Sequence, residues 1–399
     1  MKPTAATPHD VIEFSLTLAG LMVAMLLIIG ILYFAQLAAR RDRLRNSGIN
    51  FWTVALTCSI LTFVVTMLIY TTKRDASYAL GVMFGVMSLL MAILFRYERF
   101  FKNRSVGIVL KSRSNFVQAL GEAASRGLKT TSNFDVKAST IDAVAPLAES
   151  VEHQVQLLRS PGIRELDALI VIPSSSDEII AVEIASLVSR GVYVVCCDIK
   201  PNNRHFFERS LFPPAFVGSD CGIGGRLIGE AMGENCAEDE LFVVLSGPSM
   251  SAPGRARAQA VLTALRRSVV TPSIHEVAIT SWNPDEVCGV FQSEIAPLLA
   301  VDRPRSMFCA NDEICRMLSN ELYTNLDRYG KRWRLYGYDG LRDSSGTLLV
   351  RNLPYVVATV DQKVGEIGAI AARFVDEHYR RINNEKRRRV ILEPTLIRF

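Results

Sequence analysis

Long apolar runs and short ones divide the chain into two parts. Three runs before position 97 carry almost no charge, and they cover residues 11–35, 51–70 and 78–95. Each reaches the roughly 18–20 residues that an α-helix needs to cross a bilayer. Glu13, near the start of the first run, is the only acidic or basic residue within them. The pattern predicts three transmembrane helices in a membrane region that covers residues 1–104.

A cleaved signal peptide is the alternative explanation for the first run. A signal peptide has an apolar core of about 7–15 residues behind a basic segment. This run is longer, and Asp10 and Glu13 lie at its start. The two later runs would remain after cleavage, so we expect membrane attachment in either case.

From position 105 onward, short apolar runs alternate with amphipathic segments. Strand-like runs cover 105–110, 133–138, 168–172 and 193–197, and then 215–217, 241–245, 277–279, 307–310 and 334–338. Helical segments separate them, at 116–128, 141–158 and 179–189, and then at 224–232, 255–267 and 314–322. This alternation is typical of βαβ units and of a parallel sheet covered on both faces. Because the pattern begins again near 215, we expect an α/β domain over 105–399 with two doubly wound parallel sheets in two lobes.

Basic residues near the apolar runs account for the modest net charge of +5. Lysine and arginine close to span ends set the orientation of a membrane protein. The segments after the three runs hold four, two and four of them, namely Arg40, Arg41, Arg43 and Arg45, then Lys73 and Arg74, then Arg96, Arg99, Lys102 and Arg104. This bias predicts a multi-pass protein of the bacterial inner membrane, with the N-terminus outside and the large domain in the cytoplasm.

The cysteines favour the same side of the membrane. Seven of the eight follow position 104, an odd number that cannot all pair within one chain, and none has zinc-site spacing. Cys196, Cys197 and Cys309 lie in strand-like runs, where cysteine is usually a small buried hydrophobe. We expect reduced thiols, and therefore a reducing compartment.

The membrane region is expected to anchor the chain or to associate with itself. No ionisable residue lies deep in any run, whereas pumps and ion-coupled carriers usually need one. Ser77, Gly81 and Gly85 place small residues on one helical face, which favours helix–helix contact and a homo-oligomer. The basic residues from Arg380 to Arg389 suit either a solvated helix end or contact with anionic lipid of the bilayer.

Polar residues follow five of the predicted strands. They include the segments 112–116 and 247–257, Asp198, the pair Asn311 and Asp312, and Asp339. A single polar residue after a strand is more often a helix cap or a turn residue. Because ligands of doubly wound sheets bind beyond the carboxyl ends of the strands, five such ends together predict a polar ligand site. We find no catalytic constellation, no metal-binding spacing and no cofactor motif, so we do not expect an enzyme.

The soluble part resembles the type I periplasmic binding proteins, above all the ribose-binding group and the ligand-binding domain of lac-repressor-like regulators. The similarity begins near 105 and runs to the C-terminus. Its motifs appear in the family's order: DALIVIPS (167–174), GVYVVCCD (191–198), FVGSDCGIGG (216–225), SAPGRARA (251–258), FCANDE (308–313), YGYDG (336–340), VATVDQKVGEIG (357–368) and EPTLI (393–397). The resemblance implies an N-lobe of about 105–219 plus 363–393 and a C-lobe of about 220–362, joined by three crossovers that form a hinge.

The resemblance also implies which residues bind the ligand. Those that fall where the family hydrogen-bonds sugar hydroxyls are Asp198, Arg255, Asn311, Asp339 and Gln362. Phe116 falls near an aromatic that stacks on the sugar ring, and Trp282 and Asn115 are further candidates. Asp, Asn, Gln and Arg match the paired donors and acceptors of a sugar, whose C–H faces pack on aromatic rings. The chain departs from the family at Ile199, where an arginine is common, and at Cys221, where asparagine is usual.

These features favour a membrane-anchored sensor. A sugar or sugar-containing metabolite would close the lobes, and closure would be transmitted to the transmembrane helices in signal transduction. One alternative is a tethered solute-binding component of a transport system, which needs the domain outside. Another is a ligand-triggered effector of bacterial defence that disrupts the membrane. We expect no nucleic-acid partner, because apolar spans stand where a regulator would carry its DNA-binding module.

Overall fold

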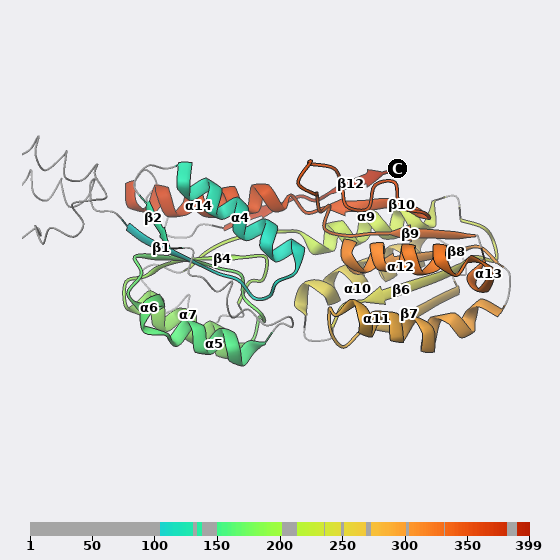
Figure 1. The fold of residues 1–399 in the computed structure, drawn as a ribbon, viewed down its shortest axis with the longest axis horizontal. Helices are drawn as coiled ribbons and strands as arrows, with labels where there is room; N and C mark the ends of the chain where they lie inside the picture. The colour runs from blue at the N-terminus through green and yellow to red at the C-terminus, as the bar shows by residue number, and fades with distance from the viewer. Residues whose placement is uncertain are drawn as a thin grey trace, which may run out of the picture. The chain divides into compact units, whose positions relative to one another are not determined.

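The computed structural model describes residues 104–130, 134–137, 150–201, 214–234, 236–248, 251–268, 273–300, 303–330, 332–380 and 389–399. They belong to one compact unit, Asn103–Phe399 (Figure 1). The three predicted spans lie outside these ranges. Within the described ranges no helix combines the length and the apolar character needed to cross a membrane.

The first lobe is built on a six-stranded sheet that is parallel throughout. Its strand order is β11-β5-β4-β3-β1-β2. The strands are β1 (Arg104–Val109), β2 (Phe134–Lys137), β3 (Ala168–Val171), β4 (Tyr193–Cys197), β5 (Ala215–Ser219) and β11 (Arg389–Leu392). Every residue of β3 is buried, as expected for a central strand with both faces covered. We call this lobe the N-lobe.

Helices cover the two faces of this sheet separately (Figure 1). One face carries α4 (Asn115–Thr130) and α14 (Val364–Arg380), and the other carries α5 (Val151–Arg159), α6 (Pro161–Arg164) and α7 (Glu178–Ser189). The buried residues of α4 recur at helical spacing, from Val117 through Leu120 and Ala124 to Leu128. Each helix layer therefore seals one of two hydrophobic clusters, one on each side of the sheet.

The second lobe, the C-lobe, holds a mixed six-stranded sheet of order β12-β10-β9-β8-β6-β7. The strands are β6 (Leu241–Ser246), β7 (Ser273–Ala278), β8 (Arg305–Cys309), β9 (Trp333–Tyr336), β10 (Val356–Asp361) and β12 (Thr395–Arg398). Its strand pairs are parallel except for β10 and β12, which pair Ala358 with Arg398 in antiparallel register. Two mostly parallel sheets, each covered by helices, confirm the two-lobed α/β part of the predicted fold class.

The C-lobe helices also pack in two layers. On one face lie α9 (Cys221–Gly233) and α10 (Ala252–Ser268), which pack closely against each other. The other face carries α11 (Pro284–Val290), the π-helix η3 (Phe291–Ile295), the 3-10 helix η4 (Ala296–Ala300), α12 (Asp312–Thr324) and α13 (Leu326–Tyr329). Two buried hydrophobic clusters again flank the sheet.

The chain passes between the lobes three times. The crossings follow β5, β10 and β11. Two of them lie side by side, because the backbone N–H of Asp220 donates to the carbonyl of Leu392 at 3.0 Å. The third leads from β10 through Gln362 and Lys363 into α14, and Lys363 adopts a left-handed φ of 61°. The hinge region is therefore formed by three short connections.

Some element bounds differ from the sequence expectation. Helix α9 begins at Cys221 rather than 224, since Asp220 caps it by accepting a hydrogen bond from the N–H of Ile223. Strand β7 begins at Ser273, four residues before the expected strand, because this edge strand mixes polar and apolar residues, with Ser273 and Glu276 exposed and Ile274 and His275 partly buried. Edge strands lack the apolar signature that buried strands show.

Candidate ligand-binding site

A buried ion pair lies at the carboxyl ends of β1 and β4 in the N-lobe. The Lys111 Nζ atom lies 3.2 Å from Asp198 Oδ2, and the two side chains are 8% and 4% exposed. Lys111 follows the apolar strand β1, and Asp198 follows β4 directly. Asp198 adopts a left-handed φ of 64°, which turns the chain as it leaves the sheet. The strand ends thus place a lysine and an aspartate together at the lobe's inner edge.

The loop after β3 is fixed beside this pair by Gln154 of α5. The Gln154 Nε2 atom donates to the carbonyl of Ile172 at 2.8 Å, and its Oε1 atom accepts from the N–H of Ser174 at 2.7 Å. Gln154 is 2% exposed, so the amide acts as an internal brace. The brace presents two buried serines, Ser174 and Ser175, at the end of β3.

The C-lobe contributes a cluster of three side chains. Asp339 Oδ1 accepts from Arg257 Nη1 at 3.3 Å and from Gln362 Nε2 at 2.6 Å. Arg257 Nη1 also donates to the carbonyl of Ala310 at 3.0 Å. The cluster draws on α10, on the segment after β9 and on the segment after β10. All three side chains are buried, which makes the contacts strong and the geometry well defined.

Glycines of α9 allow the close packing that holds Arg257 in place. A methyl group at Gly225 would overlap the carbonyl oxygen of Arg257, and one at Gly224 would overlap the hydroxyl of Tyr338. The Arg257 guanidinium carbon lies 4.1 Å from the centre of the Tyr338 ring, in cation–π contact. The GIGG motif therefore positions the arginine.

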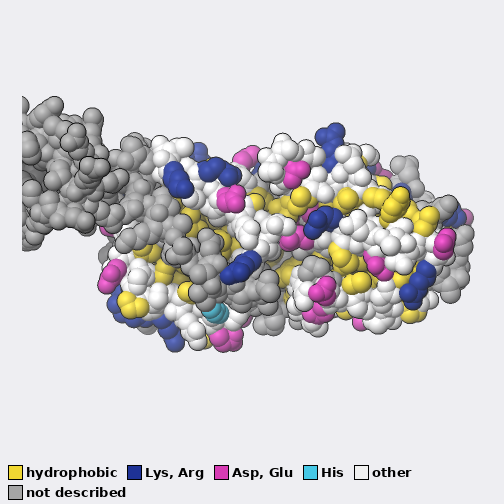
Figure 2. Space-filling model, viewed as in Figure 1, with side chains coloured by type: hydrophobic (Ala, Val, Ile, Leu, Met, Phe, Trp, Pro, Cys, Tyr) yellow, Lys and Arg dark blue, Asp and Glu magenta, His cyan; other side chains and the backbone are white. Residues whose placement is uncertain are grey.

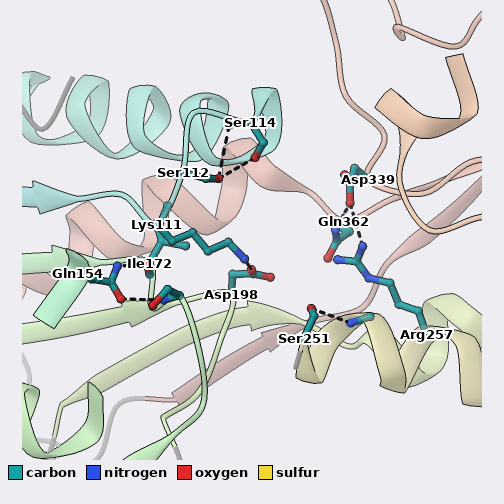
Figure 3. Close-up of polar contacts among 12 residues, drawn as sticks. Lys111, Ser112, Ser114, Gln154, Ile172, Asp198, Ser251, Arg257, Asp339 and Gln362 are labelled. Atoms are coloured by element: carbon teal, nitrogen blue, oxygen red, sulfur yellow. Dashed lines mark hydrogen bonds and ion pairs between the residues drawn. The ribbon is translucent and has the colours of Figure 1, made fainter. Parts of the chain in front are cut away.

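The two groups face one another across the lobe boundary. Figure 3 shows Lys111 and Asp198 on one side and Arg257, Asp339 and Gln362 on the other. The Asp198 charge contributes to the pKa of Asp339, although the two residues belong to different lobes. Burial raises the pKa of Asp339 well above its usual value, and the Arg257 guanidinium opposes that rise.

Several buried polar atoms of this region have no hydrogen-bond partner among the described residues. They are Ser174 Oγ, Arg257 Nε, Tyr338 Oη and Gln362 Oε1. Buried polar atoms in proteins are nearly always hydrogen-bonded to protein, water or ligand. Arg257 Nε and Gln362 Oε1 belong to the C-lobe cluster, and each lobe adds one hydroxyl. These atoms are thus suited to hydrogen-bond a polar molecule between the lobes.

The structure brings three of the predicted ligand residues together. Asp198, Asp339 and Gln362 lie in the two facing groups. Asn311 lies nearby as the N-cap of α12, and its Oδ1 atom accepts from the N–H of Ile314 at 2.8 Å. The Asn311 side chain therefore has a capping role at the start of α12.

The remaining aromatic and amide candidates are placed differently. Phe116 is 7% exposed and packs in the N-lobe core, so its ring belongs to a hydrophobic cluster. Trp282 is half-buried, and its ring lies against Gly247 in the loop after β6. Asn115 Nδ2 donates to Glu313 Oε1 at 2.7 Å and so links α4 of the N-lobe to α12 of the C-lobe.

Arg255 is exposed on α10, whereas Arg257 is the arginine that donates to Asp339. The buried residues of α10 include Gly254, Arg257, Ala258, Val261 and Leu262, at spacings of three and four. Position 257 thus lies on the buried face, and position 255 does not. Helical periodicity therefore distinguishes the buried Arg257 from the exposed Arg255. Lys111 was not among the predicted site residues, although a lysine directly after an apolar strand was visible.

The visible outer surface gives no sign of a charged interface. On the face shown in Figure 2, basic and acidic side chains are interspersed over both lobes. In the part of the chain that the structure describes, no group of three or more His, Cys, Asp and Glu residues could hold a metal ion.

Solved structures with the same fold are periplasmic sugar-binding proteins. One is a periplasmic solute-binding protein of an ABC transporter from Actinobacillus succinogenes with bound D-allose, at 19% identity and a TM-score of 0.59 over 74% of this chain and 98% of that chain. A myo-inositol-binding protein from Caulobacter has 18% identity and a TM-score of 0.60 over 74% and 93%. The fructose-binding periplasmic domain of a hybrid two-component system has 15% identity and a TM-score of 0.60 over 74% and 91%.

At these identities the likeness establishes the fold of the domain. The two-lobed α/β architecture is that of the type I periplasmic binding proteins. No family model and no curated protein matches the sequence. The fold alone does not define a function, which depends on the residues of the site.

Proposed function

We propose that the domain is a non-enzymatic receptor that binds a sugar or sugar-containing metabolite between its lobes. The facing arrangement of Lys111–Asp198 and Arg257–Asp339–Gln362 carries this proposal. Carboxylates and an amide oxygen accept hydrogen bonds from hydroxyls, and the ammonium, guanidinium and amide N–H groups donate to them. A molecule with several hydroxyls matches such a mixed set, whereas an apolar molecule would leave Arg257 Nε and Gln362 Oε1 without a hydrogen-bond partner.

The similar solved structures support a hydroxyl-rich ligand. Their bound or named ligands include D-allose, myo-inositol, D-arabinose and fructose. One of them is the fructose-binding periplasmic domain of a hybrid two-component system. We extend the proposal to a membrane-anchored sensor, in which lobe closure is transmitted to the spans predicted at 11–35, 51–70 and 78–95.

Thermal unfolding with a panel of ligands tests binding. D-allose, D-ribose, D-arabinose, D-fructose and myo-inositol are added to the full-length protein, and at least one raises the unfolding midpoint. Asp339→Asn abolishes that rise, because the neutral amide leaves the buried Arg257 guanidinium without its opposite charge. Asp327→Asn, which changes an exposed carboxylate on α13, keeps it. Absence of any shift across the panel contradicts a sugar ligand.

A tethered solute-binding component of a transporter is the second candidate, since two of the similar structures belong to ABC transporters. The two candidates place the domain on opposite sides of the membrane. Cys288 is partly exposed and offers a probe. In intact cells, a sensor with a cytoplasmic domain resists an impermeant maleimide at Cys288 until the membrane is opened. Labelling of the intact cells, lost in Cys288→Ser, favours the transport candidate.

A further inference from the structure

The segment 337–341, which carries Asp339, has a strained backbone. Asp339 has a φ of 118°, a conformation that residues with a side chain rarely adopt, and Gly340 has a φ of 63°. A methyl group at Gly340 would overlap the backbone of Asp361. Strained backbone at a binding site persists only where its surroundings hold it. The side chain that holds this turn therefore controls where the Asp339 carboxylate lies.

Asp312, the first residue of α12, makes the holding contacts. Its Oδ2 atom accepts from the N–H of Leu341 at 2.9 Å, and its Oδ1 atom accepts from Thr359 Oγ1 at 2.7 Å. Its relative exposure is 0%. A methyl group at Gly337 would overlap Asp312 Oδ1, so glycine at that position admits the carboxyl. One side chain thus ties α12 to β10 and to the turn.

The same turn reaches into the other lobe. The Leu341 side chain is 3% exposed and belongs to the N-lobe core cluster, together with Val364 and Ile367 of α14. Asp339 meets Arg257 and Gln362 only two residues earlier. A shift of this turn would therefore move Asp339, a proposed ligand-binding residue of the C-lobe, and would also disturb the packing of Leu341 in the N-lobe.

We propose that Asp312 is a positioning residue of the ligand site, which fixes the 337–341 turn so that Asp339 reaches Arg257 while Leu341 packs in the N-lobe. The part of this inference that concerns ligand affinity depends on the proposed receptor function. The part that concerns the turn does not. An asparagine at position 312 can reproduce both contacts, with its oxygen accepting from Leu341 and its nitrogen donating to Thr359.

A double-mutant cycle measures whether Asp312 sets the site without any ligand. The coupling between Arg257→Gln and Asp339→Asn is determined by unfolding of the full-length protein in three backgrounds: wild type, Asp312→Asn and Asp312→Ala. The coupling free energy between positions 257 and 339 stays within about twofold of its wild-type value in Asp312→Asn, and it is lost in Asp312→Ala. Amide hydrogen exchange at Leu341 follows the same order, at least about tenfold faster in Asp312→Ala.

Glu240 provides the matched control. It is a buried carboxylate in the same lobe, it accepts from Ser306 and Arg334, and it lies outside the ligand site. Glu240→Gln changes overall stability but leaves the Arg257–Asp339 coupling and the Leu341 exchange as in wild type. If Asp312→Ala does not fold, Thr359→Val removes one of the two Asp312 contacts at nearly constant volume and takes its place. Unchanged coupling and exchange in the variant used overturn the inference.

The test of ligand affinity uses whichever sugar of the panel raises the midpoint of thermal unfolding. Its affinity stays within about threefold of wild type in Asp312→Asn and falls at least tenfold in Asp312→Ala or Thr359→Val. If no sugar of the panel binds, the receptor proposal fails, and the coupling and exchange still decide the role of Asp312. Full affinity in Asp312→Ala, together with lost coupling, would show that the turn does not govern the ligand and contradicts the positioning role.

Discussion

The site contains four buried charged side chains, which form two ion pairs. Lys111 meets Asp198 in one lobe, and Arg257 meets Asp339 in the other. Truncating one partner of a buried pair leaves an uncompensated charge, which costs on the order of 3–5 kcal/mol. Each pair is therefore a strong constraint on its lobe as well as a proposed set of ligand contacts.

Two neighbouring arginines provide the first test at the residue scale. Arg257→Gln is expected to lower the unfolding free energy by about 3–5 kcal/mol, because Asp339 loses its cation in a buried site. It also abolishes the sugar-induced rise in midpoint. Arg255→Gln, on the exposed side of the same helix, changes stability by less than about 0.5 kcal/mol and leaves most of that rise. Calorimetry on both variants measures their stability and the sugar-induced rise. Equal loss of sugar binding in both contradicts the assignment of the ligand contact to Arg257 alone.

Asp312 gives a pH-dependent signature. Burial raises the pKa of its carboxyl to about 7, whereas hydrogen bonds from Thr359 and Leu341 oppose the rise. The charges that bear on it are those of Asp361 and Asp339, and Cys315 lies close by. Between the unfolded pKa near 4 and the folded pKa near 7, the folded state holds a proton that the unfolded state has lost. The stability that this proton contributes is complete below pH 4 and is lost as the pH rises through 7.

The measurement compares Asp312→Asn with wild type across pH. The variant lacks this titration, so its unfolding free energy relative to wild type rises between pH 5 and pH 8, by up to a few kcal/mol. Urea unfolding at several pH values measures the difference. A difference that is flat over this range would mean that the Asp312 carboxyl titrates outside it.

At the scale of elements, the contact between α9 and α10 decides where Arg257 lies. Gly225 and Gly229 allow the two helix backbones to lie close together. A methyl group at Gly225 would overlap the carbonyl oxygen of Arg257, and one at Gly229 would overlap the carbonyl oxygen of Val261. Gly225→Ala is expected to destabilise the fold by about 1–3 kcal/mol through overpacking and to weaken sugar binding with it.

Gly289 is the matched helical control for this substitution. It lies in α11 with no heavy atom near the position of an added methyl group. Gly289→Ala should be neutral or stabilising by up to about 1 kcal/mol, since alanine is the better helix former. Thermal midpoints of both variants test the contact between α9 and α10. A Gly225→Ala midpoint equal to that of wild type would show that the helices can separate at little cost.

The elements themselves were largely predictable, and the reason is physical. Central strands such as β3 are apolar at every position, and α4 repeats its apolar residues at helical spacing, so burial left a clear pattern in the sequence. The exposed edge strand β7 left a weak one. The choice between Arg255 and Arg257 required the helical phase of α10, and the Lys111–Asp198 contact required the order of β1, β3 and β4 in the sheet. Helical phase is a local pattern, whereas strand order is determined by tertiary packing, which no local pattern encodes.

At the scale of the whole molecule, the described domain has two lobes connected by three crossings and a direct contact between them. Asn115 and Glu313 join the lobes by a hydrogen bond of 2.7 Å. A ligand held by both lobes stabilises the closed arrangement by its extra contacts there. In small-angle X-ray scattering, the sugar that raises the midpoint is expected to reduce the radius of gyration in wild type. Asp339→Asn should show no such change, and a decrease in that variant would mean that closure does not depend on this site.

The most direct test of a sugar receptor is the identity of the small molecule that the purified protein carries. The full-length protein and a double variant, Asp198→Asn with Arg257→Gln, are purified in parallel, denatured, and the released molecules are analysed by mass spectrometry. We expect a hydroxyl-rich compound, a sugar or a sugar-containing metabolite, that is enriched with wild type and absent from the variant. Release of the same compound in equal amounts from both proteins, or of an apolar compound from wild type alone, would contradict it.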